Sequence, residues 1–140
     1  FCVDRHRKDF LELIKSQVSM LFCNQEEAFS MMETQVTQEA IELLSESVET
    51  VIMTLGSRGS LICENGDISY IDPLDVKVVD TTGAGDAYAA GFLYGYSQKK
   101  STVECGRIGS VLAGTVIEQI GPRIEDEMMD KLINRLKNIL

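Results

Sequence analysis

The sequence predicts an α/β fold in which a mostly parallel sheet is flanked by helices. Two short apolar runs, at 18–23 and 50–55, have the length and composition of buried strands. Segments with helical periodicity lie between and after these runs. Strands that alternate with helices are typical of a layered sheet with parallel strands. The 140 residues are enough to bury a hydrophobic core, as one domain or as part of a larger one.

The first third of the chain alternates short strands with helices. Phe10, Leu11 and Ile14 recur at helical spacing. The chain starts without methionine and in the middle of an apolar pattern, like a strand cut from a longer chain, so we expect a fragment. The predicted elements are a strand at Phe1–Val3, a helix at Lys8–Ser16, a strand at Val18–Cys23, helices at Gln25–Met32 and Gln38–Ser47, and a strand at Thr50–Leu55.

The middle of the chain predicts a small hairpin at 60–71, followed by one more strand. Asn65-Gly66 separates two short apolar stretches, which is a strong local signal for a hairpin turn. A last strand is predicted at Val76–Val79. The remainder predicts three helices, at Ala84–Tyr96, Ser101–Gln119 and Glu125–Leu140.

Two of these helices carry further signals. Ser101 and Glu104 form the sequence pattern of a capping box, and Gly121-Pro122 ends the helix that they begin. The helix from Ala84 has a face of small residues, which allows a second backbone to pack closely against it. That face consists of Ala87, Ala90, Gly91 and Gly95.

Composition excludes several classes of partner. The net charge is -9 and the pI is near 4.5, which argues against nonspecific binding to nucleic acid or to anionic lipid. No apolar run reaches the roughly 20 residues that span a membrane. The four cysteines show no metal-type pair and no disulfide framework, so we expect buried free thiols and a reducing, cytoplasmic location.

The segment Asp80–Leu93 (DTTGAGDAYAAGFL) is the most informative motif in the chain. A tight turn of Gly and Ala leads into a helix, whose first N–H groups and positive dipole end suit an anion. Asp86 adds a base beside that anion, so the pair suggests phosphoryl transfer to a hydroxyl. The alternative is an aspartate that only favours the helix dipole. No G-x-x-x-x-G-K-[ST] segment is present, so a Walker-type loop is excluded.

Three polar segments each follow a predicted strand. They are Asn24, Thr54–Gly59 and Asp80–Asp86. Ligands of open α/β sheets bind beyond the carboxyl ends of the strands. We therefore expect the three segments to converge at one edge of the sheet.

These motifs together resemble the PfkB (ribokinase-like) family of carbohydrate and nucleoside kinases. Asp80–Leu93 resembles the second signature of that family residue for residue, Thr54–Gly59 resembles its T-x-G-x-x-G turn, and Asn24–Glu27 its N-x-x-E motif. The resemblance implies a ribokinase-like fold. It covers residues 1–140 as the C-terminal nucleotide-binding and catalytic part, without the N-terminal half and lid. The opening Phe1–Arg7 is more similar to the adenosine-kinase-like branch.

The resemblance implies a role for each motif. Asp86 would be the general base, with the backbone of Gly83, Ala84 and Gly85 as the anion hole. The turn residues Thr54, Gly56 and Gly59 would hold the nucleotide, unless they form a plain strand-ending turn. Arg58 would reach a phosphate or be solvated.

Metal-linked roles are implied for four residues. Asn24 and Glu27 would act near Mg²⁺, Glu27 through water, although the same two residues fit a reciprocal helix cap equally well. Asp80 and Thr82 match positions that bind a monovalent cation such as K⁺ in some members, through backbone carbonyls. The second wall of that site would come from Val116–Arg123.

The helix that should pass the adenine carries Gly109, Ala113 and Val116, which core packing explains equally well. His6 lies in a charged run and more simply marks a solvated helix start.

The expected function is an ATP- and Mg²⁺-dependent kinase for a sugar or nucleoside hydroxyl. The alternatives are a noncatalytic nucleotide-binding or dimerising module, here a homodimer, and a kinase for another small alcohol such as a vitamin. The fragment alone is expected to be inactive.

Overall fold

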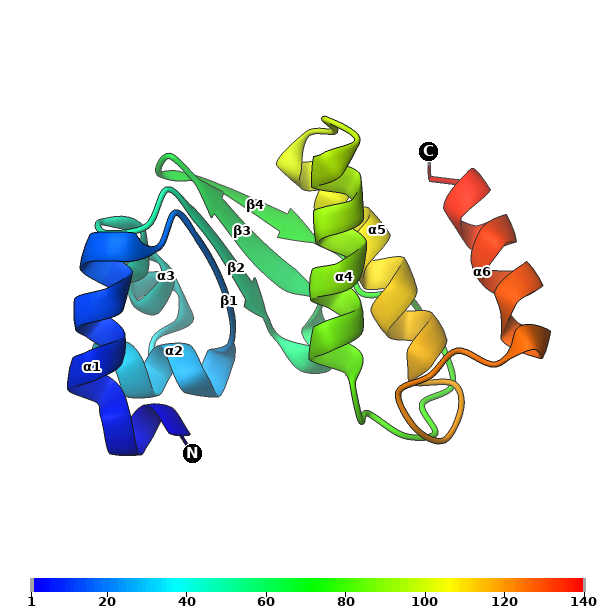
Figure 1. Ribbon diagram of the computed structural model, residues 1–140, viewed down its shortest axis with the longest axis horizontal. Coiled ribbons are helices and arrows are strands. Elements are labelled where there is room, and N and C mark those ends of the chain that lie inside the picture. Colours follow the sequence, from blue (N-terminus) through cyan, green and yellow to red (C-terminus); the bar gives the residue numbers. More distant parts are fainter. Residues whose placement is uncertain (1, 140) are drawn as a thin grey trace. The chain divides into compact units, whose positions relative to one another are not determined.

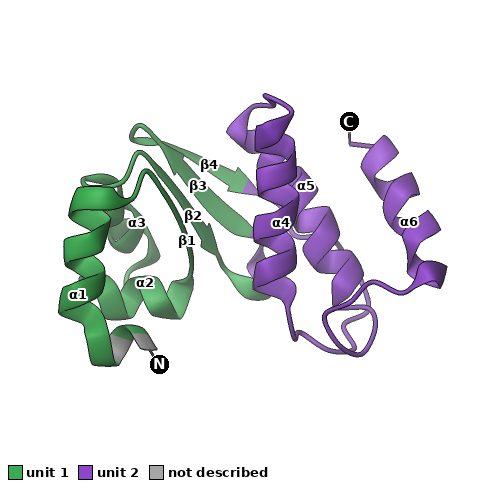
Figure 2. Cartoon of the chain, in the orientation of Figure 1, with its two compact units in different colours: residues 1–56, 60–70 green, residues 57–59, 71–140 purple. Residues whose placement is uncertain are grey.

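The computed structural model describes residues 2–139 and divides the chain into two compact units (Figure 2). The first unit comprises the residues up to Gly56 together with Ser60–Tyr70. The second comprises Ser57–Gly59 and the residues from Ile71 onward. Each unit is described by itself below.

The first unit is built on a four-stranded sheet with the order β1-β2-β3-β4 (Figure 1). Strand β1 (Met20–Asn24) pairs in parallel with β2 (Thr50–Thr54), which pairs antiparallel with β3 (Ser60–Glu64). The predicted mostly parallel arrangement therefore holds for β1 and β2, and the hairpin makes the sheet of this chain mixed. That hairpin joins β3 to β4 (Asp67–Ile71) through Asn65-Gly66, both at positive φ, as the sequence predicted.

Three helices pack with one face of this sheet into a hydrophobic core. They are α1 (Cys2–Gln17), α2 (Gln25–Met32) and α3 (Thr37–Ser45). Ile41, Leu44 and Val51 are almost completely buried in this core, together with two of the cysteines, Cys23 and Cys63. The prediction of buried free thiols is confirmed for these two residues and for Cys105 of the second unit.

Three helices make up most of the second unit: α4 (Ala84–Ser97), α5 (Thr102–Val116) and α6 (Asp126–Lys137). Helices α4 and α5 lie side by side in Figure 1 and pack closely. A Cβ on Gly91 would lie 2.8 Å from the Cα of Gly109, and a Cβ on Gly95 would lie 3.1 Å from the Cα of Cys105. The predicted small-residue face of α4 thus brings two backbones together, and the capping box of Ser101 and Glu104 begins α5 as predicted.

Two predicted strands are wrong. Of the strand at Phe1–Val3, Phe1 lies outside the described residues, while Cys2 and Val3 belong to α1, whose backbone is kinked at His6. Val76–Val79 forms no strand and has a bend at Val79. The short apolar runs there indicated strands, but no neighbouring strand supplies a ladder among the residues described.

The segment 71–80 instead runs along α5. The hydroxyl of Ser110 donates to the carbonyl of Asp72 over 3.0 Å, and Leu74 fills the space that a side chain on Gly114 would need. The N–H groups of Val79 and Asp80 both donate to the carbonyl of Ile117, over 2.7 and 3.2 Å. Helix α5 thereby fixes the path of the chain into the motif at Asp80.

The remaining predicted elements are found with boundaries that shift by one to a few residues. Between residues 2 and 139, no helix combines the length and the apolar character needed to cross a membrane.

Candidate active site

The turn at Asp80–Asp86, here called the anion turn, leads directly into α4. Gly83 is the N-cap residue and has a φ of 79°, which is the left-handed region that glycine adopts readily. Among the described residues, no side-chain oxygen caps this helix start. The N–H of Ala84 donates to the carbonyl of Thr81 over 3.1 Å. The N–H groups of Gly85 and Asp86, which follow it, are the ones that an external acceptor such as a phosphate oxygen could use.

The two glycines of the anion turn have different surroundings. A Cβ on Gly83 would lie 2.5 Å from the Cβ of Pro122, so a side chain there cannot be accommodated without movement. A Cβ on Gly85 would meet no described atom within 4 Å. The space above Gly85 is therefore open, on the side where its backbone could approach a ligand.

Asp86 is exposed and occupies the first turn of α4. A carboxylate at this position is favoured by the helix dipole. It is also adjacent to the uncapped N–H groups of the same turn. The position suits both the structural and the catalytic interpretation of Asp86.

The Asp80 carboxylate ties the anion turn to the loop that follows α5. Its Oδ1 accepts hydrogen bonds from the N–H and hydroxyl of Thr82, over 2.9 and 2.7 Å. Its Oδ2 accepts from the N–H of Gly121 over 2.9 Å. The Gly121 N–H, with the two Thr82 donors, holds the pKa of Asp80 below its ordinary value of 3.8.

This lowered pKa predicts an acid-sensitive turn. Because the folded pKa is lower than the unfolded one, the Asp80 contribution to stability is present above pH 3.8 and is lost as the pH falls through the lowered value. Asp80→Asn removes the titration and places an amide against the Gly121 N–H or the Thr82 donors. Urea unfolding should show the variant to be less stable at neutral pH, with the difference shrinking below pH 3.8. A difference independent of pH would contradict this account.

Asn24 and Glu27 form a complete capping box at the start of α2. The Asn24 side chain accepts from the Glu27 N–H over 2.8 Å, and Glu27 Oε2 accepts from the Asn24 N–H over 2.8 Å. The structural interpretation of this motif is therefore confirmed. Burial, with a smaller contribution from the Glu27 charge, raises the pKa of the neighbouring Cys23 to about 12, so Cys23 is an inert thiol at neutral pH.

The T-x-G-x-x-G segment begins where β2 ends. Thr54 pairs with Asn24 in the register of the parallel strands, so two of the three predicted polar segments do meet at the carboxyl ends of β1 and β2. Gly56 and Gly59 both have positive φ, and a Cβ on Gly59 would lie 2.1 Å from the carbonyl oxygen of Ile71. Arg58 is exposed at the end of the short 3₁₀ helix η1 (Gly56–Arg58).

The three residues predicted to pass the adenine all lie on α5. A Cβ on Gly109 would lie 2.8 Å from the carbonyl oxygen of Tyr88, and Val116 is buried, so packing accounts for both. Ala113 is partly exposed.

The loop that connects α5 to α6 supplies contacts that sequence reasoning placed only in general terms. Val116–Arg123 was expected as a wall beside Asp80. Within it, Ile117 accepts two backbone hydrogen bonds, Gly121 donates one and Pro122 covers Gly83. The Gly121-Pro122 pair was expected to end a helix and to lie within that wall, but its spacing from Asp80 carries no signal for these particular contacts. Among the residues described, no group of three His, Cys, Asp or Glu side chains could hold a metal ion by itself.

An uncapped helix start with an aspartate in its first turn, in an α/β protein, is the arrangement of an anion-binding domain that can place a base beside a phosphate. The sequence model of the "pfkB family carbohydrate kinase" matches residues 3–128. The chain belongs to this family.

Similar proteins agree with this assignment. The chain is 37% identical to an uncharacterized sugar kinase of Archaeoglobus fulgidus over 113 residues, which is 81% of this chain and 45% of that protein. It is similar to the structure of adenosine kinase from Sinorhizobium meliloti, with a TM-score of 0.90 and 40% identity over 96% of this chain and 42% of the other. It is also similar to the Methanocaldococcus jannaschii nucleoside kinase, an archaeal member of the ribokinase family. There the TM-score is 0.78, with 32% identity over 94% of this chain and 44% of the other.

The predicted ribokinase-like fold is therefore confirmed. The chain spans less than half the length of these relatives.

Proposed function

We propose that the protein containing this chain transfers the γ-phosphate of ATP to a hydroxyl of a sugar or a nucleoside. The observation that carries this proposal is the anion turn, in which Asp86 stands in the first turn of a helix that no described side chain caps. Family membership adds support. So do relatives that are named as sugar, adenosine and nucleoside kinases.

In the proposed reaction, backbone N–H groups stabilise charge and one carboxylate accepts a proton. Within Gly83–Asp86, the N–H groups of Gly83, Gly85 and Asp86 stabilise the negative charge that develops on the transferred phosphoryl group, while the Ala84 N–H donates to the Thr81 carbonyl and shapes the turn. Asp86 accepts the hydroxyl proton as the new O–P bond forms and the bond between the γ-phosphorus and ADP breaks. Transfer is direct, so no phosphoenzyme forms.

Mg²⁺ would neutralise charge between the phosphates. Glu27 can take part only in a limited way, because its Oε2 already accepts from the Asn24 N–H. A carboxylate retains further acceptor capacity, which fits contact with the ion through water. At Asp80 both carboxylate oxygens already accept from Thr82 or Gly121, which favours backbone carbonyls of this region as the ligands of a monovalent cation.

Thr54, Gly56, Arg58 and Gly59 are proposed to contact the nucleotide phosphates or ribose, and Gly109, Ala113 and Val116 to pass the adenine. The buried free cysteines fit a reducing, cytoplasmic location. No nucleic-acid or membrane partner is proposed.

The direct test is an assay of the full gene product that contains these residues, with Mg-ATP and a panel of sugars and nucleosides. Phosphorylation of at least one acceptor is expected. ATP binding without phosphorylation of any acceptor would favour the second candidate, a noncatalytic nucleotide-binding module. That alternative is supported by β1, which is an edge strand among the described residues and could pair with a second copy of this chain; sizing of the 140-residue chain in solution tests it.

The 140-residue chain by itself is expected to show little or no turnover. The matched parts cover only 45% and 42% of two of its relatives, so groups that orient an acceptor lie outside the matched part. Proximity and orientation can supply about 7–11 kcal/mol of barrier reduction. Turnover by the isolated chain at about 1 s⁻¹ or faster, as in ordinary kinases, would refute this expectation.

A further inference from the structure

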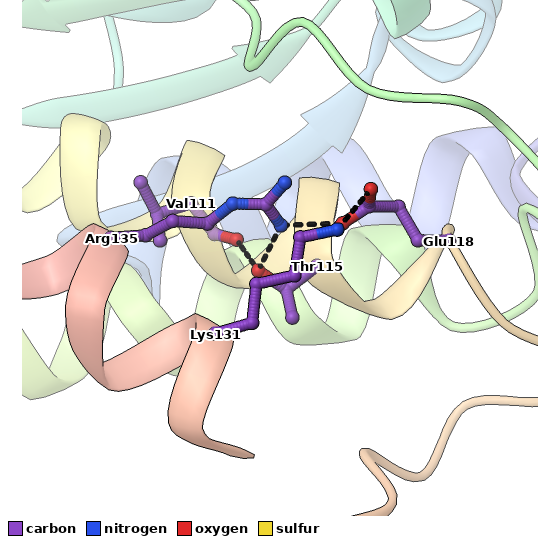
Figure 3. Close-up of polar contacts among 5 residues, drawn as sticks. All are labelled: Val111, Thr115, Glu118, Lys131 and Arg135. Carbon is purple, nitrogen blue, oxygen red and sulfur yellow. Dashed lines mark hydrogen bonds and ion pairs between the residues drawn. The ribbon is translucent and has the colours of Figure 1, made fainter. Parts of the chain in front are cut away.

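A charged cluster joins the end of α5 to α6 (Figure 3). Glu118 accepts from Lys131 Nζ over 2.7 Å and from an Arg135 guanidinium nitrogen over 2.5 Å. The same Arg135 nitrogen lies 3.0 Å from the hydroxyl of Thr115, which itself donates to the carbonyl of Val111. We call Glu118, Lys131, Arg135 and Thr115 the Glu118 cluster.

Glu118, Arg135 and Thr115 are largely withdrawn from water, whereas Lys131 is exposed. The side chain of Glu118 is 12% exposed, that of Arg135 19% and that of Lys131 46%. Burial by itself would raise the pKa of Glu118, but Arg135 and Lys131 outweigh it and hold the pKa below its ordinary value. A carboxylate this far from water depends on its partners, because losing one leaves an uncompensated charge.

The cluster is also a large part of what attaches α6. Leu132 is the only buried side chain of Asp126–Lys137, every residue of which the structure describes. Met128 and Leu136 are partly buried, so apolar contacts supply part of the attachment of this helix. Glu118 and the two cations add the ion pairs that fix α6 at the end of α5.

Glu118 is covalently next to the residue that holds the anion turn. The carbonyl of Ile117 accepts the N–H groups of Val79 and Asp80. Beyond Glu118, Gln119 accepts from the Glu125 N–H over 3.3 Å and donates to the Arg123 carbonyl, which closes the loop. Gly121 and Pro122 of that loop then contact Asp80 and Gly83.

We propose that the Glu118 cluster is a positioning device for phosphoryl transfer. It fixes the loop 117–123, and through that loop it holds the anion turn in the geometry that α4 presents to a phosphate. Among the described residues, no hydrogen bond or ion pair joins these side chains to the anion turn, so Glu118 and Arg135 act through Ile117, Gly121 and Pro122. This role rests on the proposed function of the anion turn.

Hydrogen–deuterium exchange of the full gene product, followed by mass spectrometry, tests the coupling without requiring activity. Glu118→Gln keeps the shape and removes the charge. Exchange should accelerate about tenfold in peptides covering 79–83 and 117–124, while peptides from β1 and β2 stay unchanged. Glu127→Gln, an exposed acid in the first turn of α6, is the matched control and should change nothing there.

Substitutions of the two cations should accelerate hydrogen exchange to different degrees. Lys131→Met should give a smaller acceleration than Glu118→Gln, Arg135→Lys should keep part of the protection, and Lys137→Met serves as the control for loss of charge. Faster exchange confined to α6, with 79–83 unchanged, would overturn the proposal. So would an equal effect of Glu127→Gln.

A second experiment measures kcat of the same variants with an acceptor that the full gene product phosphorylates. We expect kcat to fall about tenfold in Glu118→Gln, a modest fraction of what electrostatic stabilisation contributes, and to recover partly in Arg135→Lys compared with Arg135→Met. An unchanged kcat despite faster exchange would also overturn the positioning role. If the wild-type protein phosphorylates nothing, the proposed function fails, while exchange at 79–83 still decides whether the cluster controls the turn.

Discussion

Asp86→Asn is expected to abolish phosphorylation by the full gene product while nucleotide binding stays near that of the wild type. Asparagine keeps the size and the hydrogen-bonding reach of the side chain but cannot accept the proton of the acceptor hydroxyl. General-base catalysis contributes about 10²–10⁴-fold, so kcat should fall by that factor. The measurement is kcat at saturating ATP and acceptor, with the ATP dissociation constant taken separately by calorimetry.

The chain offers a matched control for this substitution. Asp126 is also an exposed aspartate in the first turn of a helix, so Asp126→Asn loses the same interaction with a helix dipole. Activity should be unaffected in Asp126→Asn. If Asp86→Asn retains activity within about tenfold of the wild type, Asp86 is not the base and serves only the start of α4.

Local signals in the sequence predicted most of the fold. The hairpin at Asn65-Gly66, the capping boxes at Asn24 and Ser101 and the small-residue face of α4 each depend on residues close together in the chain. Such features are fixed by backbone conformation and by neighbours within one turn. They were therefore predictable without tertiary information.

The wrong strand predictions have a different cause. Val76–Val79 has the apolar, β-branched composition of a strand, but its N–H at Val79 bonds to the end of a helix rather than to a strand. Composition indicates a preference for a pleated, half-buried surface and does not show what the backbone of a segment pairs with. At the start of the chain, Cys2 and Val3 lie in a helix that begins before the predicted Lys8–Ser16. The strand prediction there was wrong because a run of three apolar residues is too short to show a helical or a strand period.

In the candidate site, too, the local motifs were predictable from the sequence and the long-range contacts were not. The anion turn and its aspartate follow from one continuous motif, and the pairing of Asn24 with Thr54 follows from parallel strands. The contacts of Asp80 with Gly121 span 41 positions, and no periodic or spacing rule connects them. The Glu118 cluster likewise joins two helices through side chains that each look like ordinary surface charges in the sequence.

Gly83→Ala is expected to reduce the stability of the protein, whereas Gly85→Ala is expected to reduce phosphorylation without loss of stability. Alanine at 83 would have to adopt a φ of 79° and place its Cβ 2.5 Å from Pro122. Each of these effects costs about 1–3 kcal/mol, so the second unit should lose a large share of its stability. Urea unfolding followed by far-ultraviolet circular dichroism measures the loss.

Alanine at 85 should have the opposite effect on stability. Gly85 lies in the first turn of α4 with space around it, so replacing glycine by alanine in a helix should stabilise the protein by up to about 1 kcal/mol. The added methyl group would occupy the open side of the turn where a phosphate oxygen has to approach the backbone. Phosphorylation should therefore fall although the protein is at least as stable as the wild type. A Gly85→Ala variant with wild-type kcat and ATP affinity would show that the phosphate does not approach this side of the anion turn.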